Sequence, residues 1–291
     1  MQTLFSIACN RWDPEPDAVL QDEAITALEG GKVLLLPHLA FPLPQSEQGL
    51  LSPEFLGGHA KNVSLGPDGQ IKHSAGADEQ REALRHLMER FARQATTLVS
   101  SLFPRYAASL ERARTSYRPA EIAGRAYSPI KDDTRLHVDA FPTRPMRGRR
   151  ILRLFSNINP HGKPRIWRVG EPFEDMAQKI LPRVREPIVL KNWVLAAVRA
   201  THGVRSPYDN LMLGLHDQAK LDDAYQKNAP QAEVSFPAQS TWLCFTDRVM
   251  HAAMAGQFVL EQTFHLDVAA MAAPERAPIN VLEKMAGRKL A

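Results

Sequence analysis

The feature that most constrains the fold is a change of sequence pattern near residue 119. Before it, apolar residues recur at helical spacing, most clearly from residue 78 until Pro104. After it, short runs of β-branched and aromatic residues alternate with turns. Strand-like runs lie at residues 122–127, 134–141, 150–158, 241–245 and 257–268. Many strands preceded by helices favour an α+β chain whose core is a double-stranded β-helix (a jelly-roll or cupin-like core), with N-terminal helices packed outside.

On this pattern the chain divides into three stretches of one continuous domain. Residues 1–118 form an N-terminal helical and strand segment that buttresses the core, residues 119–272 form the β-helix core with helical inserts, and residues 273–291 form a C-terminal tail. Helices are expected at residues 17–29, 78–103, 106–115, 173–180, 193–201 and 217–227. The arginines of residues 106–115 are interpreted as a solvated helix face.

Composition places the chain among ordinary globular proteins, since 44% of its 291 residues are hydrophobic and 23% are charged. Two cysteines, Cys9 and Cys244, make no disulfide framework and favour a reducing compartment. Residues 1–10 lack a signal-peptide pattern, and the most apolar stretch, residues 33–44, is broken by prolines and too short to cross a bilayer. These features predict a cytoplasmic protein.

The net charge of +4 and the pI of about 9.1 favour an anionic partner, such as nucleic acid, an acidic sugar or the anionic cytoplasmic leaflet. A basic surface that is only solvated explains the same charge. Nucleic acid is not the expected partner, because aromatic residues are only 7% and no reader motif is present. The sequence also lacks a phosphate-binding glycine loop and the Gly-x-Ser-x-Gly elbow of serine hydrolases.

The chemistry-bearing pattern is His137-Val138-Asp139 with His251 far downstream. Residues two apart on a strand point to the same side, so His137 and Asp139 share a face. With His251 from a later strand, they make a two-histidine, one-carboxylate set of the kind that holds Fe(II) and leaves positions for a co-substrate and O2. The sequence therefore predicts an iron-dependent oxygenase with His137, Asp139 and His251 as ligands.

A His-x-Asp pattern is weak by itself, because His265-Leu266-Asp267 is a second one in the same chain. The alternative for either is a half-buried histidine that hydrogen-bonds to its neighbours. Position separates them, since only His137 lies early in the strand region with a later histidine to complete the set. Two other histidines, His202 and His216, have no convincing ligand spacing and are expected to be structural.

An oxygenase of this kind also needs a cation for the far carboxylate of 2-oxoglutarate. The segment after His251 offers no Lys or Arg before Arg276, so the cation has to come from elsewhere. Residues 150–158 supply two candidates, and Arg153 is preferred to Arg150 because it shares a face with Phe155. A surface arginine with a snorkelling stem remains the alternative for each.

Basic and aromatic residues cluster between residues 144 and 168, and guanidinium groups suit carboxylate and phosphate. A solvated basic loop is the alternative reading of this cluster. The candidates for contact with an acidic substrate are Arg144, Arg165, Trp167 and Arg168.

Four longer blocks of sequence resemble those of the Kdo hydroxylases, Fe(II)/2-oxoglutarate-dependent dioxygenases. They are KDDTRLHVDAFP at residues 131–142, LRLFSNINP at 152–160, WRVGEPF at 167–173 and DRVMHAA at 247–253. The resemblance extends over most of the chain. It implies hydroxylation at carbon 3 of 3-deoxy-D-manno-oct-2-ulosonic acid (Kdo) on Kdo-lipid A to give Ko, with 2-oxoglutarate converted to succinate and O2 consumed.

By position, the resemblance makes His137, Asp139 and His251 the iron ligands and directs Arg153 or Arg150 to 2-oxoglutarate. It also implies an acidic glycolipid substrate, which suits the basic surface, and peripheral docking on the cytoplasmic face of the inner membrane. A cupin-like module that binds an acidic sugar or a nucleotide, with a structural or vestigial metal, is the alternative function. A hydrolytic zinc site is disfavoured because such sites are usually richer in His or Cys.

Overall fold

The computed structural model describes residues 2–58, 60–185 and 203–291; the helix predicted at residues 193–201 lies outside these ranges. The helices are α1 (Ala18–Glu29), α2 (Asp78–Leu102), α3 (Phe173–Ile180), α5 (Pro207–Leu221), α6 (Asp223–Asn228) and α7 (Pro278–Ala286). The strands are β1 (Leu4–Ser6), β2 (Val33–Leu36), β3 (Val63–Leu65), β4 (Ile71–Lys72), β5 (Glu111–Arg118), β6 (Arg150–Asn157), β7 (Arg165–Gly170), β8 (Gln231–Phe236), β9 (Thr241–Phe245), β10 (His251–Ala255) and β11 (Val259–Leu266).

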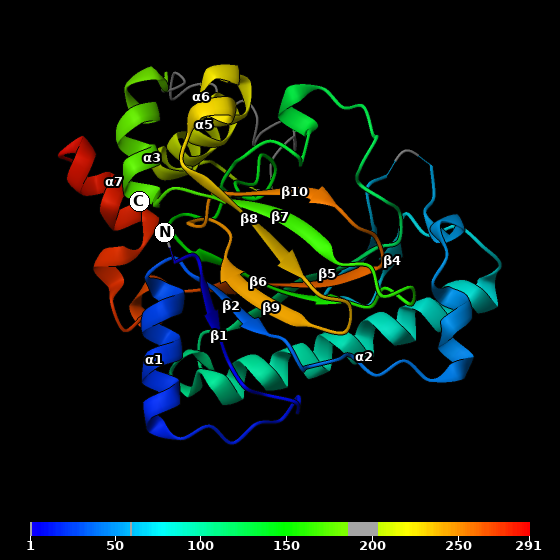
Figure 1. Cartoon of the computed structure of the whole chain (residues 1–291). Helices are drawn as coiled ribbons and strands as arrows, with labels where there is room; N and C mark the ends of the chain where they lie inside the picture. The colour runs from blue at the N-terminus through cyan, green and yellow to red at the C-terminus, as the bar shows by residue number, and fades with distance from the viewer. Residues whose placement is uncertain (1, 59, 186–202) are drawn as a thin grey trace.

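Two sheets form the centre of the chain (Figure 1). The large sheet has the strand order β1-β2-β9-β6-β11-β5-β3-β4, and the small sheet has the order β10-β7-β8. The strand pairings are antiparallel, except that β1 runs parallel to β2. The fold is thus mixed α/β, with a large sheet, a small sheet and helices outside them.

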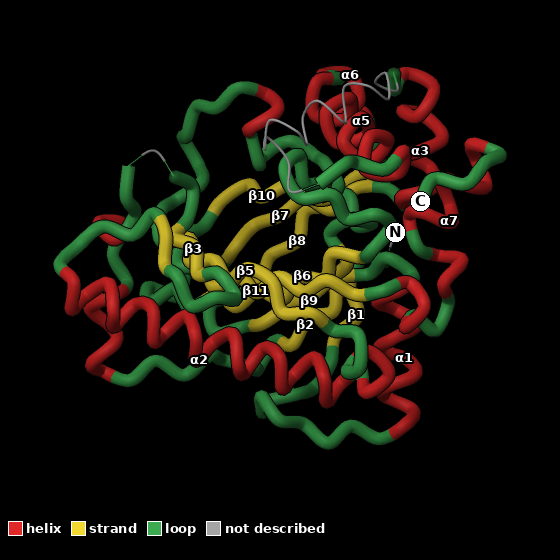
Figure 2. Tube along the Cα trace, turned by 180° about the vertical axis from the view of Figure 1, so that it is seen from behind, coloured by secondary structure: helices red, strands yellow, loops and turns green. Residues whose placement is uncertain are grey.

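Helices α1 and α2 cover the outer face of the large sheet (Figures 1 and 2). The side chain of Asp17 accepts a hydrogen bond from the Leu20 amide at 2.8 Å, which caps α1 as the sequence predicts. Such a cap stabilises a helix by about 1 kcal/mol. Along α2 the apolar stripe that includes Leu84, Phe91 and Leu98 is fully buried, so this helix is held by burial of one face.

Strand alternation divides the interior into two cores. On β6, Leu152 and Leu154 belong to the core beneath α1 and α2. Phe155 belongs to the second core, which lies between the two sheets and includes Trp167 and Trp242. Arg153 is two residues from Phe155 and therefore faces the space between the sheets.

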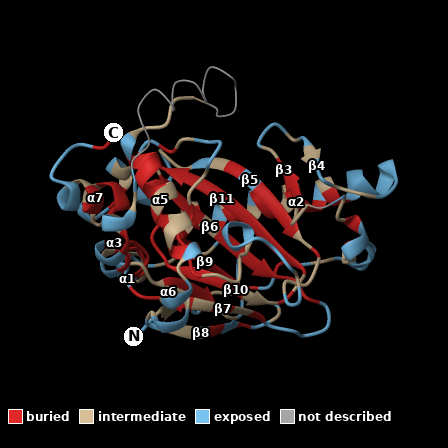
Figure 3. Cartoon of the chain, turned by 90° about the horizontal axis from the view of Figure 1, so that it is seen from above, coloured by how far each residue is buried: buried red, intermediate tan, exposed pale blue. Residues whose placement is uncertain are grey.

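The remaining helices α3, α5, α6 and α7 gather at one end of the sheets (Figures 1 and 3). Helix α5 begins with a capping box, in which Ser206 and Asp209 exchange hydrogen bonds. Because α5 is one continuous helix, its capped first turn also sets the position of its last turns. Those turns carry His216 and Lys220, which are four residues apart and so on one helix face.

Three sequence-based predictions are wrong. Residues 106–115 are not a helix, because residues 111–118 form β5 between β11 and β3, with Ala113, Thr115, Ser116 and Tyr117 buried. Residues 122–127 form no strand. Residues 134–141 form no regular strand either, and their ladder is reduced to one antiparallel bridge between His137 and His251.

In the part of the chain that the structure describes, no helix has both the length and the apolar character needed to cross a bilayer.

Candidate metal centre and its cavity

The site is assembled by the main chain of two distant segments. The His137 amide donates a hydrogen bond to the His251 carbonyl at 3.0 Å, and the His251 amide donates one to the His137 carbonyl at 2.9 Å. Two residues on, the Asp139 amide donates to the Thr246 carbonyl at 2.7 Å. These bonds fix the Cα positions of all three predicted ligands before any side chain is considered.

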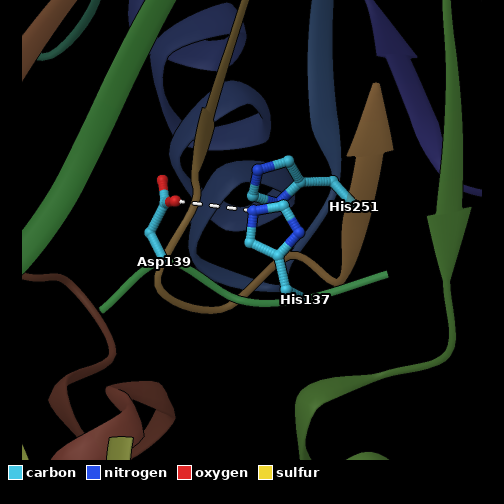
Figure 4. Close-up of side chains that lie close together, drawn as sticks. All are labelled: His137, Asp139 and His251. Atoms are coloured by element: carbon cyan, nitrogen blue, oxygen red, sulfur yellow. Dashed lines mark ion pairs between the residues drawn. The ribbon is translucent and has the colours of Figure 1, made fainter. Parts of the chain in front are cut away.

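The three side chains converge in a buried position (Figure 4). Their ligand atoms all lie within 4.8 Å of one another, and His137 Nε2 is 3.9 Å from Asp139 Oδ1. The ring centroids of His137 and His251 are 4.6 Å apart. Because the donors come so close without bonding to one another, a single ion placed among them is within reach of all three.

The hydrogen bonds of the two rings fix their tautomers. His137 Nδ1 lies 2.7 Å from the Arg135 carbonyl oxygen, and His251 Nδ1 lies 2.8 Å from the Val249 carbonyl oxygen. A carbonyl oxygen only accepts, so each Nδ1 carries the proton. Each Nε2 is left with its lone pair, which is the arrangement that orients a histidine toward a metal.

The protonation states also fit a metal. Burial lowers the pKa of His137 well below its usual value, and the neighbouring His251 lowers it further. Burial likewise lowers the pKa of His251. Burial alone would raise the pKa of Asp139, but Arg153 and His251 outweigh it and hold that pKa below its ordinary value. Two neutral imidazoles and one carboxylate suit a divalent first-row metal.

A cavity of about 480 Å³ opens over the three ligands. Six basic side chains line it, against four carboxylates, so its charge favours anions. The basic residues are Lys61, Arg118, Lys131, Arg153, Arg165 and Lys220, and the acidic ones are Asp133, Asp139, Asp217 and Glu261.

The guanidinium group of Arg153 lies between the ligand Asp139 and Glu261. Its Nε is 3.2 Å from Asp139 Oδ2, and its Nη1 is 3.4 Å from Glu261 Oε1. Glu261 also pairs with Arg118, whose Nη2 is 2.9 Å away. Strand β11 lies between β6 and β5, so its carboxylate orients one arginine from each neighbour. Arg118 and Arg153 thus bring positive charge to the cavity, although the segment after His251 has no Lys or Arg before Arg276.

Arg165 and Trp167 lie on β7 and both line the cavity. The Trp167 ring stacks on the His251 ring, with centroids 5.2 Å apart and planes at 28°. Arg165 donates to the Gly256 carbonyl at 2.7 Å, and its burial lowers its pKa to about 9. Arg165 Nε and Trp167 Nε1 are buried without a hydrogen-bond partner among the described residues. Unsatisfied buried donors beside a cavity are what an anionic ligand would satisfy.

The other predicted residues lie elsewhere. Arg150 points to the opposite face of β6 from Arg153, where it forms a buried ion pair with Asp247 at 2.7 Å. Arg168 alternates away from Trp167 and donates to the Thr134 carbonyl at 3.0 Å. Arg150 and Arg168 therefore contact other protein groups and do not line the cavity over the ligands. Arg144 lines a neighbouring cavity.

Among the described residues, the second His-x-Asp pattern forms no metal set. His265 Nδ1 lies 3.9 Å from Glu111 Oε1, and Asp267 pairs with Arg149 at 2.8 Å. His265 is buried beside Glu111, and no hydrogen bond of its ring is found among the described residues, so the alternative of a histidine that hydrogen-bonds to its neighbours stays a prediction.

Several cavity residues were missed from the sequence. Arg118 was not predicted as a cavity residue, because most of β5 was expected to belong to a helix at residues 106–115. Lys61 has no local signal, since it comes from a loop that only the tertiary fold brings to the site. His216, interpreted as structural, lies in the cavity with its ring centroid 5.3 Å from that of His137. The sequence could have indicated this position for His216, because His216 and Lys220 are four residues apart and so share one face of α5.

Two sheets that enclose two buried imidazoles and one carboxylate define the chain as a member of the two-histidine, one-carboxylate metalloprotein class. Residues 11–289 match the family described as 3-deoxy-D-manno-oct-2-ulosonic acid (Kdo) hydroxylase. The chain belongs to this family.

Solved structures agree with that membership. The Kdo hydroxylase KdoO, described as a non-heme Fe(II) alphaketoglutarate dependent dioxygenase in complex with alphaketoglutarate and Fe(III), is 47% identical, with 100% of this chain and 98% of that chain covered and a TM-score of 0.96. Its complex with cobalt(II) gives 49% identity, 99% and 97% coverage and a TM-score of 0.97. No curated protein sequence matches the chain.

Proposed function

We propose that the chain is an Fe(II)/2-oxoglutarate-dependent dioxygenase that hydroxylates Kdo. The observation that carries this function is the set of His137, Asp139 and His251 at the base of a cavity rich in cations. Relatives that align over nearly the whole chain are Kdo hydroxylases and bind iron and alphaketoglutarate. We place the hydroxylation at carbon 3 of Kdo.

The bound iron with 2-oxoglutarate and O2 supplies the oxidising chemistry, in which a C–H bond of the sugar becomes C–OH while the co-substrate is decarboxylated to succinate. His137, Asp139 and His251 would hold the metal through Nε2, a carboxylate oxygen and Nε2. The Arg135 and Val249 carbonyls keep the two rings oriented. With three ligands from the protein, a bound metal would keep coordination positions for the co-substrate and O2.

Arg153 is the residue we propose for the far carboxylate of 2-oxoglutarate. Glu261 holds its guanidinium group from one side, so little side-chain entropy is lost when the co-substrate binds. Arg118 and Arg165 bring two further guanidinium groups to the same cavity. The stacked Trp167 ring adds a flat wall with one free N–H beside His251.

Kdo is itself a sugar acid, and its carboxylate lies two carbons from carbon 3. A cation close to the metal must therefore receive it. Lys220 fits, because it lines the cavity and is only 2% exposed. Among the described residues its ammonium group donates one hydrogen bond, to the Ile130 carbonyl at 3.1 Å, and lies 3.9 Å from Asp133 Oδ1. Two donor positions of its ammonium group remain for the sugar.

We propose that the two sheets are the halves of a double-stranded β-helix within one continuous domain. The helices of residues 1–118 cover its outer face, and strands from the same segment extend the large sheet at both edges. Residues 119–272 supply the ligands and most of the cavity. Residues 273–291 carry α7, which packs beside α3 at the end of the sheets.

The acceptor we propose is Kdo on lipid A, with the protein docked peripherally on the cytoplasmic face of the inner membrane. The net charge of +4 supports attraction to an anionic leaflet. Sedimentation with anionic vesicles tests the docking. Binding at low salt that falls with added salt is expected, and no binding at low salt would contradict it.

The test of the function is turnover of a Kdo-bearing acceptor with Fe(II), 2-oxoglutarate and O2. Mass spectrometry should find a product heavier by one oxygen atom, together with an equal amount of succinate. The alternative, a cupin-like module that only binds an acidic sugar or a nucleotide, gives ligand binding without either product. His137→Ala then separates the two, because it abolishes turnover in an enzyme and spares sugar binding in a module.

A further inference from the structure

A second cavity, of about 260 Å³, adjoins the catalytic one. The two share Asn62, Arg118, Pro142, Arg153 and Glu261 in their linings, so they are contiguous. The second cavity is lined from β5, β11 and the loop after Phe141. Strand β5 pairs with β3 near one edge of the large sheet (Figure 2).

Arg114 and Arg144 distinguish this second cavity. Arg118 and Arg153 are held by Glu261, and Arg149 is held by Glu111. By contrast, the guanidinium groups of Arg114 and Arg144 make no ion pair or hydrogen bond with any described residue. Burial lowers the pKa of Arg114, and the nearby Arg144 lowers it further, so the two cations lie close enough to repel each other.

Arg114 and Arg144 are exposed and form no ion pair with any described residue. Glu261 opposes the effect of Arg144 on Arg114, and a bound anion would reduce the remaining repulsion between the two cations. The geometry supports such an anion. Arg114 is four residues from Arg118 on β5, so both side chains point to the same side of the strand. Arg114 and Arg144 also line a third cavity, of about 220 Å³, together with Asp68, Lys72 and His73. The pair therefore lies where the second and third cavities meet.

Polar neighbours complete the lining. Ser116, Thr263 and His265 face the same cavity. Burial lowers the pKa of His265 to about 4, and Arg149 and Arg144 contribute. His265 is therefore neutral near pH 7, so it offers one donor and one acceptor without adding charge.

We propose that Arg114 and Arg144 form an oxyanion subsite, which binds a phosphate or carboxylate group that the acceptor carries outside the sugar that is hydroxylated. The inference rests on the proposed function, since it assumes an acceptor that enters the catalytic cavity. It adds a specificity-determining contact in a different cavity from the metal. The 2-oxoglutarate interactions are left to Arg153 and its neighbours.

The test uses the full-length protein with Kdo2-lipid A in detergent micelles. The variants are Arg114→Gln, Arg144→Gln and their double variant. Arg93→Gln is the matched control, because Arg93 is an exposed arginine of α2, on the outer face of the large sheet. All four variants remove positive charge, so the control separates a local contact from a general loss of attraction to anionic micelles.

Each single variant is expected to raise the KM for the acceptor about tenfold, which corresponds to about 1.4 kcal/mol. The double variant should raise it further, while kcat and the KM for 2-oxoglutarate stay unchanged. Arg93→Gln should behave as the wild type. An unchanged acceptor KM in the double variant, or an equal rise in Arg93→Gln, would overturn the proposal.

Dephosphorylated Kdo2-lipid A identifies the anion. If the effect of the variants disappears with this acceptor, the subsite binds phosphate; if the effect persists, it binds a carboxylate. Equilibrium binding of Kdo2-lipid A to Co(II)-loaded protein gives a readout that needs no turnover. Failure of the wild type to make product would count against the proposed function, whereas equal binding by the wild type and the double variant would count against the subsite alone.

Discussion

His137 and His251 exchange main-chain hydrogen bonds in both directions, at 3.0 and 2.9 Å, although many strands separate them in the chain. The two residues form an isolated antiparallel bridge, which is not part of a longer β-ladder. It fixes the relative positions of the two backbones, while the Arg135 and Val249 carbonyls fix the two rings. The metal centre is thus prepared by the backbone, and a metal would need little rearrangement to bind.

The first prediction concerns metal affinity. His137→Ala or His251→Ala should weaken Co(II) binding by more than the roughly 10–100-fold that loss of an outer-shell partner costs, because a ligand itself is removed. Titration followed by the visible spectrum of Co(II) measures this. His38→Ala, which changes an exposed histidine, should bind as the wild type does. Equal affinity in all three variants would place the metal elsewhere.

The second prediction concerns 2-oxoglutarate. Arg153→Met should raise the KM for 2-oxoglutarate about 10- to 100-fold, as expected for loss of a charged hydrogen bond of about 1.5–3 kcal/mol. Arg153→Lys keeps the charge but loses the fork geometry, so it should recover only part of the affinity. Because Arg153 also contacts Asp139, Co(II) affinity is measured in both variants. A fall in metal affinity with an unchanged 2-oxoglutarate KM would assign Arg153 to the metal ligand instead.

The metal set could be predicted from sequence because it depends on two local facts. Residues two apart share a side when the chain is extended, and His137 and Asp139 keep this relation although their segment forms no regular strand. The choice of Arg153 over Arg150 followed from the same alternation. It agrees with the opposite faces of β6 on which these two residues lie.

The rest of the cavity depends on tertiary contacts that no local pattern reports. No local signal in residues 106–115 excludes a helix, and pairing with β11 and β3 makes residues 111–118 a strand. Lys61 Nζ lies 2.9 Å from Asp133 Oδ1, although the two residues are far apart in the sequence. Strands β7 and β8 were not predicted, since in each of them buried residues alternate with exposed or half-buried ones over a short length.

The third prediction concerns Lys220 and the sugar carboxylate. Lys220→Met keeps the length of the buried stem but removes the ammonium group, so the KM for the Kdo acceptor should rise about tenfold or more. The KM for 2-oxoglutarate should not change, because Arg153 is intact. Steady-state kinetics with each substrate varied in turn separates the two. A rise in the 2-oxoglutarate KM alone would show that Lys220 serves the co-substrate.

The fourth prediction concerns stability. Arg150 and Asp247 are 0% and 1% exposed in their side chains, and the two bonds between them are 2.7 and 3.1 Å long. Arg150→Met should lower the free energy of unfolding by about 3–5 kcal/mol, because it leaves a buried carboxylate without its partner. The double variant with Asp247→Leu should lose less than Arg150→Met alone. Denaturant unfolding measures both, and a smaller loss in the single variant than in the double would contradict the argument.

The last prediction concerns pH and follows from His265, whose side chain is 11% exposed. Burial, then Arg149, lower its pKa to about 4, with Arg144 and Arg153 acting in the same sense and Glu111 opposing them. As the pH falls below 6.5, the unfolded chain protonates this histidine while the folded chain does not until about pH 4. The unfolded state therefore binds more protons in this window, and the free energy of unfolding falls as the pH falls.

The size of the effect is up to about 3 kcal/mol, at roughly 1.4 kcal/mol for each unit of pKa difference. The wild type should lose more stability between pH 7 and pH 4.5 than His265→Gln does, because glutamine does not titrate (~2–3 kcal/mol difference). His38→Gln, at an exposed position, should lose as much as the wild type. If His265→Gln follows the wild type across this range, the histidine titrates alike in both states, and the acid sensitivity of the fold lies in its carboxylates.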